Sequence, residues 1–132
     1  MNRCTAVVVV MSVMALALAV AVSRPAAAQF YFGKTYSQQT GEGLFRTLCQ
    51  GCHMPDAKGA IGAGAYPALA HNPRLGAAVY PLSVILHGQR AMPPFDDSLS
   101  DEQIANVINY VRTHFGNQYR DQVTPAMVKA HR

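Results

Sequence analysis

The chain has 132 residues, half of them apolar, and a formal charge of +4 at pH 7. This length suits one domain with a single hydrophobic core. Arg3 and Arg24 both lie within the apolar first 28 residues, so the rest of the chain is closer to neutral. The absence of any lysine or arginine run argues against nucleic-acid binding, and the apolar content argues against low-complexity disorder.

Residues 1–28 have the three parts of a secretory signal peptide. Arg3 supplies the positive start, Thr5–Val22 form an uncharged apolar run, and Ala26–Ala28 offer small residues for cleavage before Gln29. The apolar run also reaches the minimum length of a membrane span, so a retained anchor is the alternative. We expect cleavage, because small residues follow the run closely, and therefore export to the periplasm without stable membrane insertion.

The chain after the signal begins with an N-terminal leader over residues 29–40, which is aromatic over residues 29–36, and a first helix is predicted over Ser37–Cys49. The apolar residues of this helix fall on one side at helical spacing: Leu44, Phe45 and Leu48. Residues 55–65 are rich in glycine and alanine and predict a loop. A short helix is expected over Pro73–Ala78. Another should open with Pro81 in its first turn and end at Gly88.

The clearest predicted element is a long helix near the C-terminus. Ser100 can cap it, Gln103 completes a capping box, and Leu99 with Ile104 can form a hydrophobic staple. The apolar positions repeat at helical spacing up to Gly116, which should end the helix: Ile104, Val107, Ile108, Val111 and Phe115.

A short terminal helix is predicted to start at Thr124-Pro125 and to reach Ala130. No segment alternates apolar and polar residues for long enough to predict a strand. We therefore expect an all-α domain of three to five helices over residues 41–116, followed by a C-terminal extension over residues 117–132.

The motif that carries chemistry is Cys49-Gln50-Gly51-Cys52-His53, which contains the only cysteines after residue 28. C-x-x-C-H is the attachment signature of c-type haem. Residues three apart share one face of a helical turn, so both thiols can reach the two vinyl groups of one haem. His53 then lies under the porphyrin and can bind the iron. The sequence predicts one covalently attached haem c, which would also stabilise a small exported domain.

Three other interpretations of the cysteine pair are weaker. A thioredoxin-like redox pair would begin a helix in a βαβ unit, and no such pattern occurs. A structural zinc site needs four ligands, and no second cysteine pair stands at finger-like spacing. A disulfide between residues three apart would close a very small loop and stabilise little.

The second axial ligand is predicted among three methionines, Met54, Met92 and Met127. Met54 follows the histidine directly and cannot reach the opposite face of the haem, and Met127 lies beyond the last long helix. Met92 lies in a loop between two helices, and two prolines stiffen this loop. We therefore expect Met92 to bind the iron. His/Met ligation raises the reduction potential and fills the coordination sphere. His71 or His87 would instead give bis-histidine ligation and a lower potential.

From about Gly41 to Phe115 the chain resembles a class I monohaem cytochrome c. In that family a glycine eight residues before the first cysteine permits a close crossing with the last helix, and an aromatic residue four positions before it packs alongside. Gly41 and Phe45 stand at these positions, and Val107 and Tyr110 resemble the partner face of the last helix. The resemblance implies a cytochrome c fold, with its helices packed around one haem.

Tyr66-Pro67-Ala68-Leu69 resembles the family's Gly-Pro-x-Leu, with a tyrosine in place of the glycine. The resemblance implies that the Pro67 carbonyl accepts the second N–H of the haem-ligand histidine and that Leu69 packs against the haem ring. The four-helix cytochrome c′ type carries its C-x-x-C-H near the C-terminus, so the early position of Cys49 excludes that architecture.

The stretch from Val111 to Arg132 is similar to tails on cytochrome subunits of periplasmic dehydrogenases. This resemblance implies an electron carrier rather than an enzyme, with a periplasmic dehydrogenase as donor and a cytochrome or terminal oxidase as acceptor. One alternative is a membrane-tethered cytochrome subunit of a dehydrogenase or respiratory complex, which would retain residues 1–28. The other is a haem enzyme with an open distal site, which ligation by Met92 would exclude.

Overall fold

A computed structural model describes residues 36–62 and 64–132. The predicted signal peptide, residues 1–28, and residues 29–35 of the predicted leader lie outside these described residues. From Tyr36 onward the described chain belongs to one compact unit in which helices predominate. No helix within the described ranges is both long and apolar enough to cross a membrane.

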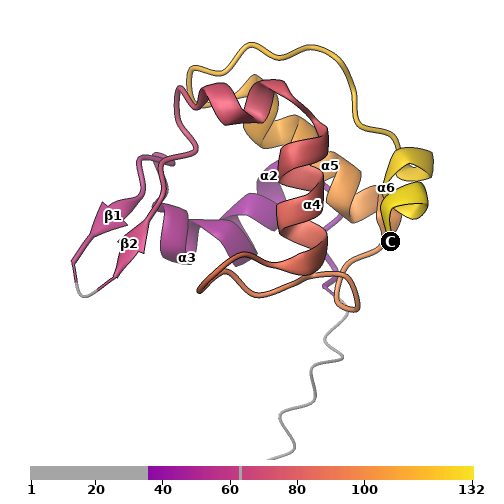
Figure 1. Cartoon of the computed structure of the whole chain (residues 1–132), viewed down its shortest axis with the longest axis horizontal. Helices are drawn as coiled ribbons and strands as arrows, with labels where there is room; N and C mark the ends of the chain where they lie inside the picture. The colour runs from indigo at the N-terminus through magenta and orange to yellow at the C-terminus, as the bar shows by residue number, and fades with distance from the viewer. Residues whose placement is uncertain (1–35, 63) are drawn as a thin grey trace, which may run out of the picture. The chain divides into compact units, whose positions relative to one another are not determined.

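The chain enters the domain through one continuous helical run (Figure 1) made of α2 (Gly41–Leu44), the π-helical η1 (Phe45–Cys49) and α3 (Gln50–His53). The predicted helix over Ser37–Cys49 is therefore wrong at both ends. The run starts later because the Thr40 hydroxyl caps it, accepting from the Gly43 N–H at 3.1 Å. It continues through the whole Cys-x-x-Cys-His motif.

The residues before this helix are not helical, because the side chain of Gln103, in a later helix, binds their backbone carbonyls. The Gln103 amide nitrogen donates to the carbonyls of Tyr36 and Gln38, at 2.7 and 2.8 Å. These bonds join residues more than sixty positions apart, so the local sequence carries no sign of them.

A small antiparallel hairpin follows, formed by β1 (Ala60–Ile61) and β2 (Ala65–Tyr66), with Ala60 opposite Tyr66. The prediction of loop over the whole of 55–65, and of no strand, is wrong at this hairpin. Two-residue strands are too short to show an alternating pattern, so periodicity could not indicate them.

Two short helices come next. The 3-10 helix η2 (Pro73–Gly76) ends two residues before the predicted limit at Ala78, and its cap is the Asn72 side chain. Helix α4 (Val79–His87) contains Pro81 in its first turn, as predicted, and ends directly before Gly88.

Helix α5 (Asp101–Thr113) begins with the predicted capping box. The Gln103 N–H donates to the Ser100 hydroxyl at 3.2 Å, and the Ser100 N–H donates to the Gln103 side chain at 2.9 Å. The helix ends at Thr113, so the prediction that it continues to Gly116 is wrong. Phe115 lies in the turn beyond, where its ring packs 4.7 Å from that of Phe45 between centroids.

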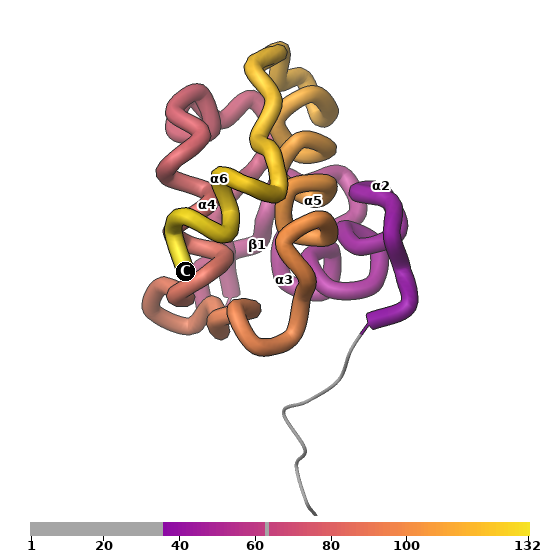
Figure 2. The backbone as a smooth tube through the Cα atoms, turned by 90° about the vertical axis from the view of Figure 1, so that its right-hand side faces the viewer, coloured from indigo at the N-terminus to yellow at the C-terminus, as the bar shows by residue number. Residues whose placement is uncertain are grey.

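The terminal helix α6 (Pro125–His131) is capped by Thr124, as predicted, and ends one residue beyond Ala130. In Figure 2, α5 lies between α2 on one side and α6 on the other. Val123 and Val128 of the tail are buried in the same hydrophobic core as the rest of the domain. The segment predicted as a C-terminal extension is thus packed into the core.

The first and last long helices cross at Gly41. A Cβ at this position would lie 2.3 Å from the Asn106 carbonyl oxygen and 2.5 Å from the Tyr110 Cβ, so only glycine allows this approach. Val107 is buried on α5, and the Phe45 ring lies 5.9 Å from that of Tyr110. The close crossing that the family resemblance implied is present.

Candidate haem site

The two thiols of the motif lie on one helical run, one turn apart. Cys49 ends η1 and is partly exposed, whereas Cys52 lies in α3 and is exposed. Both thiols are free, and burial, together with the neighbouring Cys52, raises the pKa of the Cys49 thiol to about 12. The pair is therefore available for a covalent bond at one surface of the helix.

A π-helical turn directly precedes the second half of the motif. The Gln50 N–H donates to the Phe45 carbonyl, five residues back, instead of to the residue four back. Single π turns inside helices occur frequently at functional sites because they change the direction in which following side chains point. Here the turn contains both Phe45, whose ring packs near that of Tyr110 on α5, and Cys49, the first residue of the motif.

His53 is the last residue of α3, and only 8% of it is exposed. Met54 has a left-handed φ of 67°, which reverses the chain at once, and the Gly59 N–H returns to donate to the His53 carbonyl at 3.0 Å. The imidazole Nδ1 lies 2.8 Å from the Pro67 carbonyl oxygen. Because a carbonyl can only accept, Nδ1 carries the proton and Nε2 keeps its lone pair for a metal.

Backbone contacts on both sides place Pro67 beside this imidazole. Upstream, Tyr66 pairs with Ala60 in the hairpin. Downstream, the Ala57 carbonyl accepts from the N–H groups of Leu69 and Ala70 at 2.7 and 2.9 Å. The structure therefore shows the histidine–Pro67 contact that the family resemblance implied.

Gly59 allows the two chain segments of this loop to lie against each other. It has a φ of +69°, and a Cβ there would lie 2.1 Å from the Tyr66 carbonyl oxygen and 2.8 Å from the Pro67 carbonyl carbon. Any other residue would push the Pro67 peptide away from His53. The tyrosine that replaces the family's glycine at position 66 does not prevent this turn.

Leu69 and Met92 occupy two separate segments. Leu69 is partly buried and packs against the hydrophobic core. Met92 is half-buried in the loop between α4 and α5, where its backbone exchanges two hydrogen bonds with Gln89, at 3.0 and 3.1 Å. The middle of this loop is tied to α4, since the Phe95 N–H donates to the Ile85 carbonyl at 2.9 Å. Met92 thus stands on a braced loop.

The two alternative ligands, His71 and His87, stand at the ends of other segments. The His71 ring packs over the turn after α5, so that a Cβ on Gly116 would lie 2.0 Å from His71 Cε1. His87 is exposed and is the last residue of α4.

Taken together, these residues fit a c-type haem. Cys49 and Cys52 offer free thiols one turn apart, and His53 is a buried imidazole whose Nε2 is available to a metal. A soft thioether, suited to ferrous iron, stands on a loop of its own.

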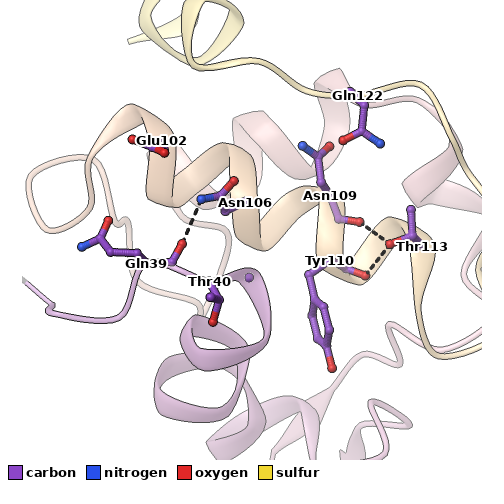
Figure 3. A pocket seen from close by; sticks show the side chains of 9 residues that line it. Gln39, Thr40, Glu102, Asn106, Asn109, Tyr110, Thr113 and Gln122 are labelled. Atoms are coloured by element: carbon purple, nitrogen blue, oxygen red, sulfur yellow. Dashed lines mark hydrogen bonds between the residues drawn. The ribbon is translucent and has the colours of Figure 1, made fainter.

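A hollow of about 480 Å³ shares none of these residues. It lies along α5 and the residues before α2, and Figure 3 shows its amide side chains. Asn106 donates to the Gln39 carbonyl at 2.9 Å, and the Thr113 hydroxyl donates to the carbonyl of Asn109 at 2.8 Å. The first bond joins α5 to the residues before α2, and the second lies within α5.

Residues 37–111 match the protein family described as "Cytochrome C oxidase, cbb3-type, subunit III". The chain belongs to this family. It is a c-type cytochrome, an electron carrier that binds haem c covalently.

Similar proteins include three subunits of dehydrogenases. The fructose dehydrogenase cytochrome subunit of Gluconobacter japonicus is 38% identical over 93 residues, which are 58% of this chain and 19% of that protein. The cytochrome c subunit of the alcohol dehydrogenase (quinone) of Komagataeibacter europaeus is 38% identical over 94 residues, 61% of this chain and 19% of that protein. A nicotinate dehydrogenase subunit of Pseudomonas putida is 36% identical over 89 residues, 60% of this chain and 7% of that protein. The chain therefore spans between 7% and 19% of these relatives.

Two buried polar residues of the domain, Asn117 and Arg112, were not predicted from the sequence. Arg112 ends an apolar helical stripe, and Asn117 follows the glycine predicted to end the helix. The sequence signal that could have indicated Asn117 is that position, since asparagine near a helix end often bonds backbone groups.

Proposed function

We propose that this cytochrome is an exported electron carrier with a single haem, attached through Cys49 and Cys52 and ligated by His53 and Met92. The observation that carries the proposal is the 2.8 Å contact between His53 Nδ1 and the Pro67 carbonyl. Haem-ligating histidines need this kind of partner, because it fixes the tautomer that leaves Nε2 for the iron.

Hydrogen bonds within the chain would hold both axial ligands, His53 and Met92, in place while the iron gains or loses an electron. The haem, when bound, supplies a one-electron couple between Fe(II) and Fe(III). His53 is held by Pro67, and Met92 is held by a loop tied to Gln89 and α4. Leu69, which is partly buried against the core, would pack beside the haem and keep water away. With both ligands preset, neither redox state requires much rearrangement.

The proposed electron donor is a periplasmic dehydrogenase, and the proposed acceptor is a cytochrome or terminal oxidase. The three relatives are subunits of dehydrogenases that differ in the substrate they are named for. Two of the three are named as cytochrome subunits, which supports a role in taking electrons from the catalytic part of a dehydrogenase. The signal-like residues 1–28 support export to the periplasm.

Replacement of Met92 by alanine tests the ligand set. We expect Met92→Ala to abolish the charge-transfer band of the ferric methionine–iron bond and to let carbon monoxide bind the ferrous protein. Absorption spectra of purified holoprotein provide both readouts.

Met127→Ala is the matched control, because Met127 is 37% exposed on α6 and should leave the spectrum unchanged. A wild-type protein that lacks the band, or that binds carbon monoxide readily, would contradict His/Met ligation and favour an open haem site.

A further inference from the structure

Asn117 has every polar atom of its side chain engaged, although the residue is only 4% exposed. Its Nδ2 donates to the Leu69 and Val111 carbonyls, both at 2.8 Å, and its Oδ1 accepts from the Asn72 N–H at 2.9 Å. The side chain therefore ties residues 69–72 to the end of α5.

This tie has a direct consequence for Pro67. The Leu69 peptide is held from both sides, by Ala57 through its N–H and by Asn117 through its carbonyl. Pro67 stands two residues upstream, between this anchor and the Tyr66–Ala60 pair of the hairpin. Proline has a fixed φ, so little freedom remains for its carbonyl between the two anchors.

We infer that Asn117 is a positioning residue that tunes the reduction potential by holding the Pro67 carbonyl against His53 Nδ1. The inference rests on the proposed function, in which His53 Nε2 binds the iron. A hydrogen bond donated by Nδ1 makes the imidazole a stronger ligand and favours the ferric state. Loosening the Leu69–Asn72 segment should weaken that bond and favour the ferrous state.

The test compares two asparagines whose side chains each bond the backbone of another segment. Asn117→Leu removes the tie to residues 69–72. Asn109→Leu is the matched control, because Asn109 exchanges two hydrogen bonds with the backbone of Val123, at 2.9 and 2.8 Å, and does not contact the Pro67 segment. Both variants are purified as holoprotein, and potentiometric titration and thermal melts are recorded for each.

We expect both variants to melt at a lower temperature and only Asn117→Leu to change the potential. We expect the equilibrium constant for reduction to rise about tenfold, which raises the reduction potential by about 59 mV for a one-electron couple. A purely structural role would lower the melting temperature of both variants and leave the potential of both unchanged. An unchanged potential in a folded Asn117→Leu holoprotein would overturn the inference.

Proton exchange in the wild-type protein gives a second measurement that does not depend on whether the variant folds. His131 Nδ1 has a bond of the same 2.8 Å length, to the Met127 carbonyl, but is exposed. We expect the His53 Nδ1–H and the Asn117 amide protons to exchange together, and far more slowly than the His131 proton. Equal exchange rates for the two histidines would overturn the inference. Failure of the proposed function would look different, because the wild-type protein would then lack haem on its two cysteines.

Discussion

At the scale of single residues, the domain depends on a buried charge. Arg112 is fully buried at the end of α5 and donates to the Leu75 and Gly76 carbonyls at 2.8 and 3.2 Å. Its Nη2 also bonds both carboxylate oxygens of Asp121, at 2.7 and 2.8 Å. One side chain thus joins η2, α5 and the tail, and a buried charge of this kind is stabilising only while its partners remain.

Asp121→Asn should reduce stability in a way that depends on pH. The hydrogen bond from Arg112 lowers the pKa of Asp121 in the folded protein. The carboxylate therefore stabilises the fold at pH values above its ordinary pKa of about 3.9, and this contribution is lost as pH falls through the lowered value. The Asp121→Asn variant should melt at a lower temperature than the wild type at pH 7. Below about pH 4 its stability should fall less steeply than that of the wild type, because the titrating carboxylate is absent.

Thermal melts of the wild type and the variant across pH check this prediction, and the difference between them isolates Asp121. Asp56, whose pKa is lowered mainly by the Lys58 N–H, keeps its own contribution in both proteins. Parallel curves for the two proteins at acid pH would contradict the assignment.

The residues of the motif were predictable because their chemistry depends on local spacing. Cys49, Cys52 and His53 are neighbours in sequence, and helical geometry puts them at one site. The partner at Pro67 came from a short pattern near Leu69. In contrast, Arg112 and Asn117 bond backbone carbonyls some forty residues away. No local pattern specifies such partners, so their burial could not be predicted.

At the scale of elements, the crossing of α2 and α5 organises the domain. The helix caps were predictable from the local sequence. Ser100 accepts a hydrogen bond from Gln103 and Thr124 accepts one from Met127, in each case from a residue three positions further along the chain. The start of α2 was mispredicted, because the side chain of the distant Gln103 bonds the backbone before it. The end of α5 was mispredicted, because Asn117 in the following turn bonds the Val111 carbonyl. The local sequence specified which helices form, and tertiary contacts decided where they stop.

Gly41→Ala should destabilise the fold strongly. The added Cβ would lie 2.3 Å from the Asn106 carbonyl oxygen, so the two helices would have to separate. Overpacking of this kind costs roughly 1–3 kcal/mol or more. Urea denaturation followed by far-UV circular dichroism measures the loss.

Gly51→Ala is the matched control, since Gly51 lies in the same helical run and a Cβ there would meet nothing within 4 Å. This change should be neutral or stabilising, because alanine is favoured in helices by about 0.5–1 kcal/mol. An equal effect of the two substitutions would refute the close crossing.

At the scale of the whole molecule, the tail is part of the folded domain. Val123 and Val128 are buried in the core, and Arg132 donates to Asp101 at 2.6 Å, to Asp96 and to the Leu99 carbonyl at 2.8 Å. The tail therefore begins at the C-terminal end of α5, where Asp121 pairs with Arg112. It ends beside the N-terminal end of the same helix, close to the loop that carries Met92.

Deletion of residues 118–132 should lower the free energy of unfolding by at least about 3 kcal/mol, because the buried side chains of Val123 and Val128 would be lost from the core. Haem attachment should persist, since Cys49, Cys52 and His53 do not contact the tail through any hydrogen bond in the described residues. Denaturation curves and the haem content of the purified protein check the two parts. Lys129→Ala, an exposed change in α6, should alter neither.

Digestion with trypsin tests directly whether one haem is bound to the two cysteines. Cleavage after Arg46 and Lys58 releases a peptide, residues 47–58, that contains the whole motif. Addition of both thiols to the vinyl groups of haem predicts a peptide heavier than its sequence by the mass of one complete haem. A peptide of unmodified mass, or one lighter by two hydrogens as in a disulfide, would contradict the account.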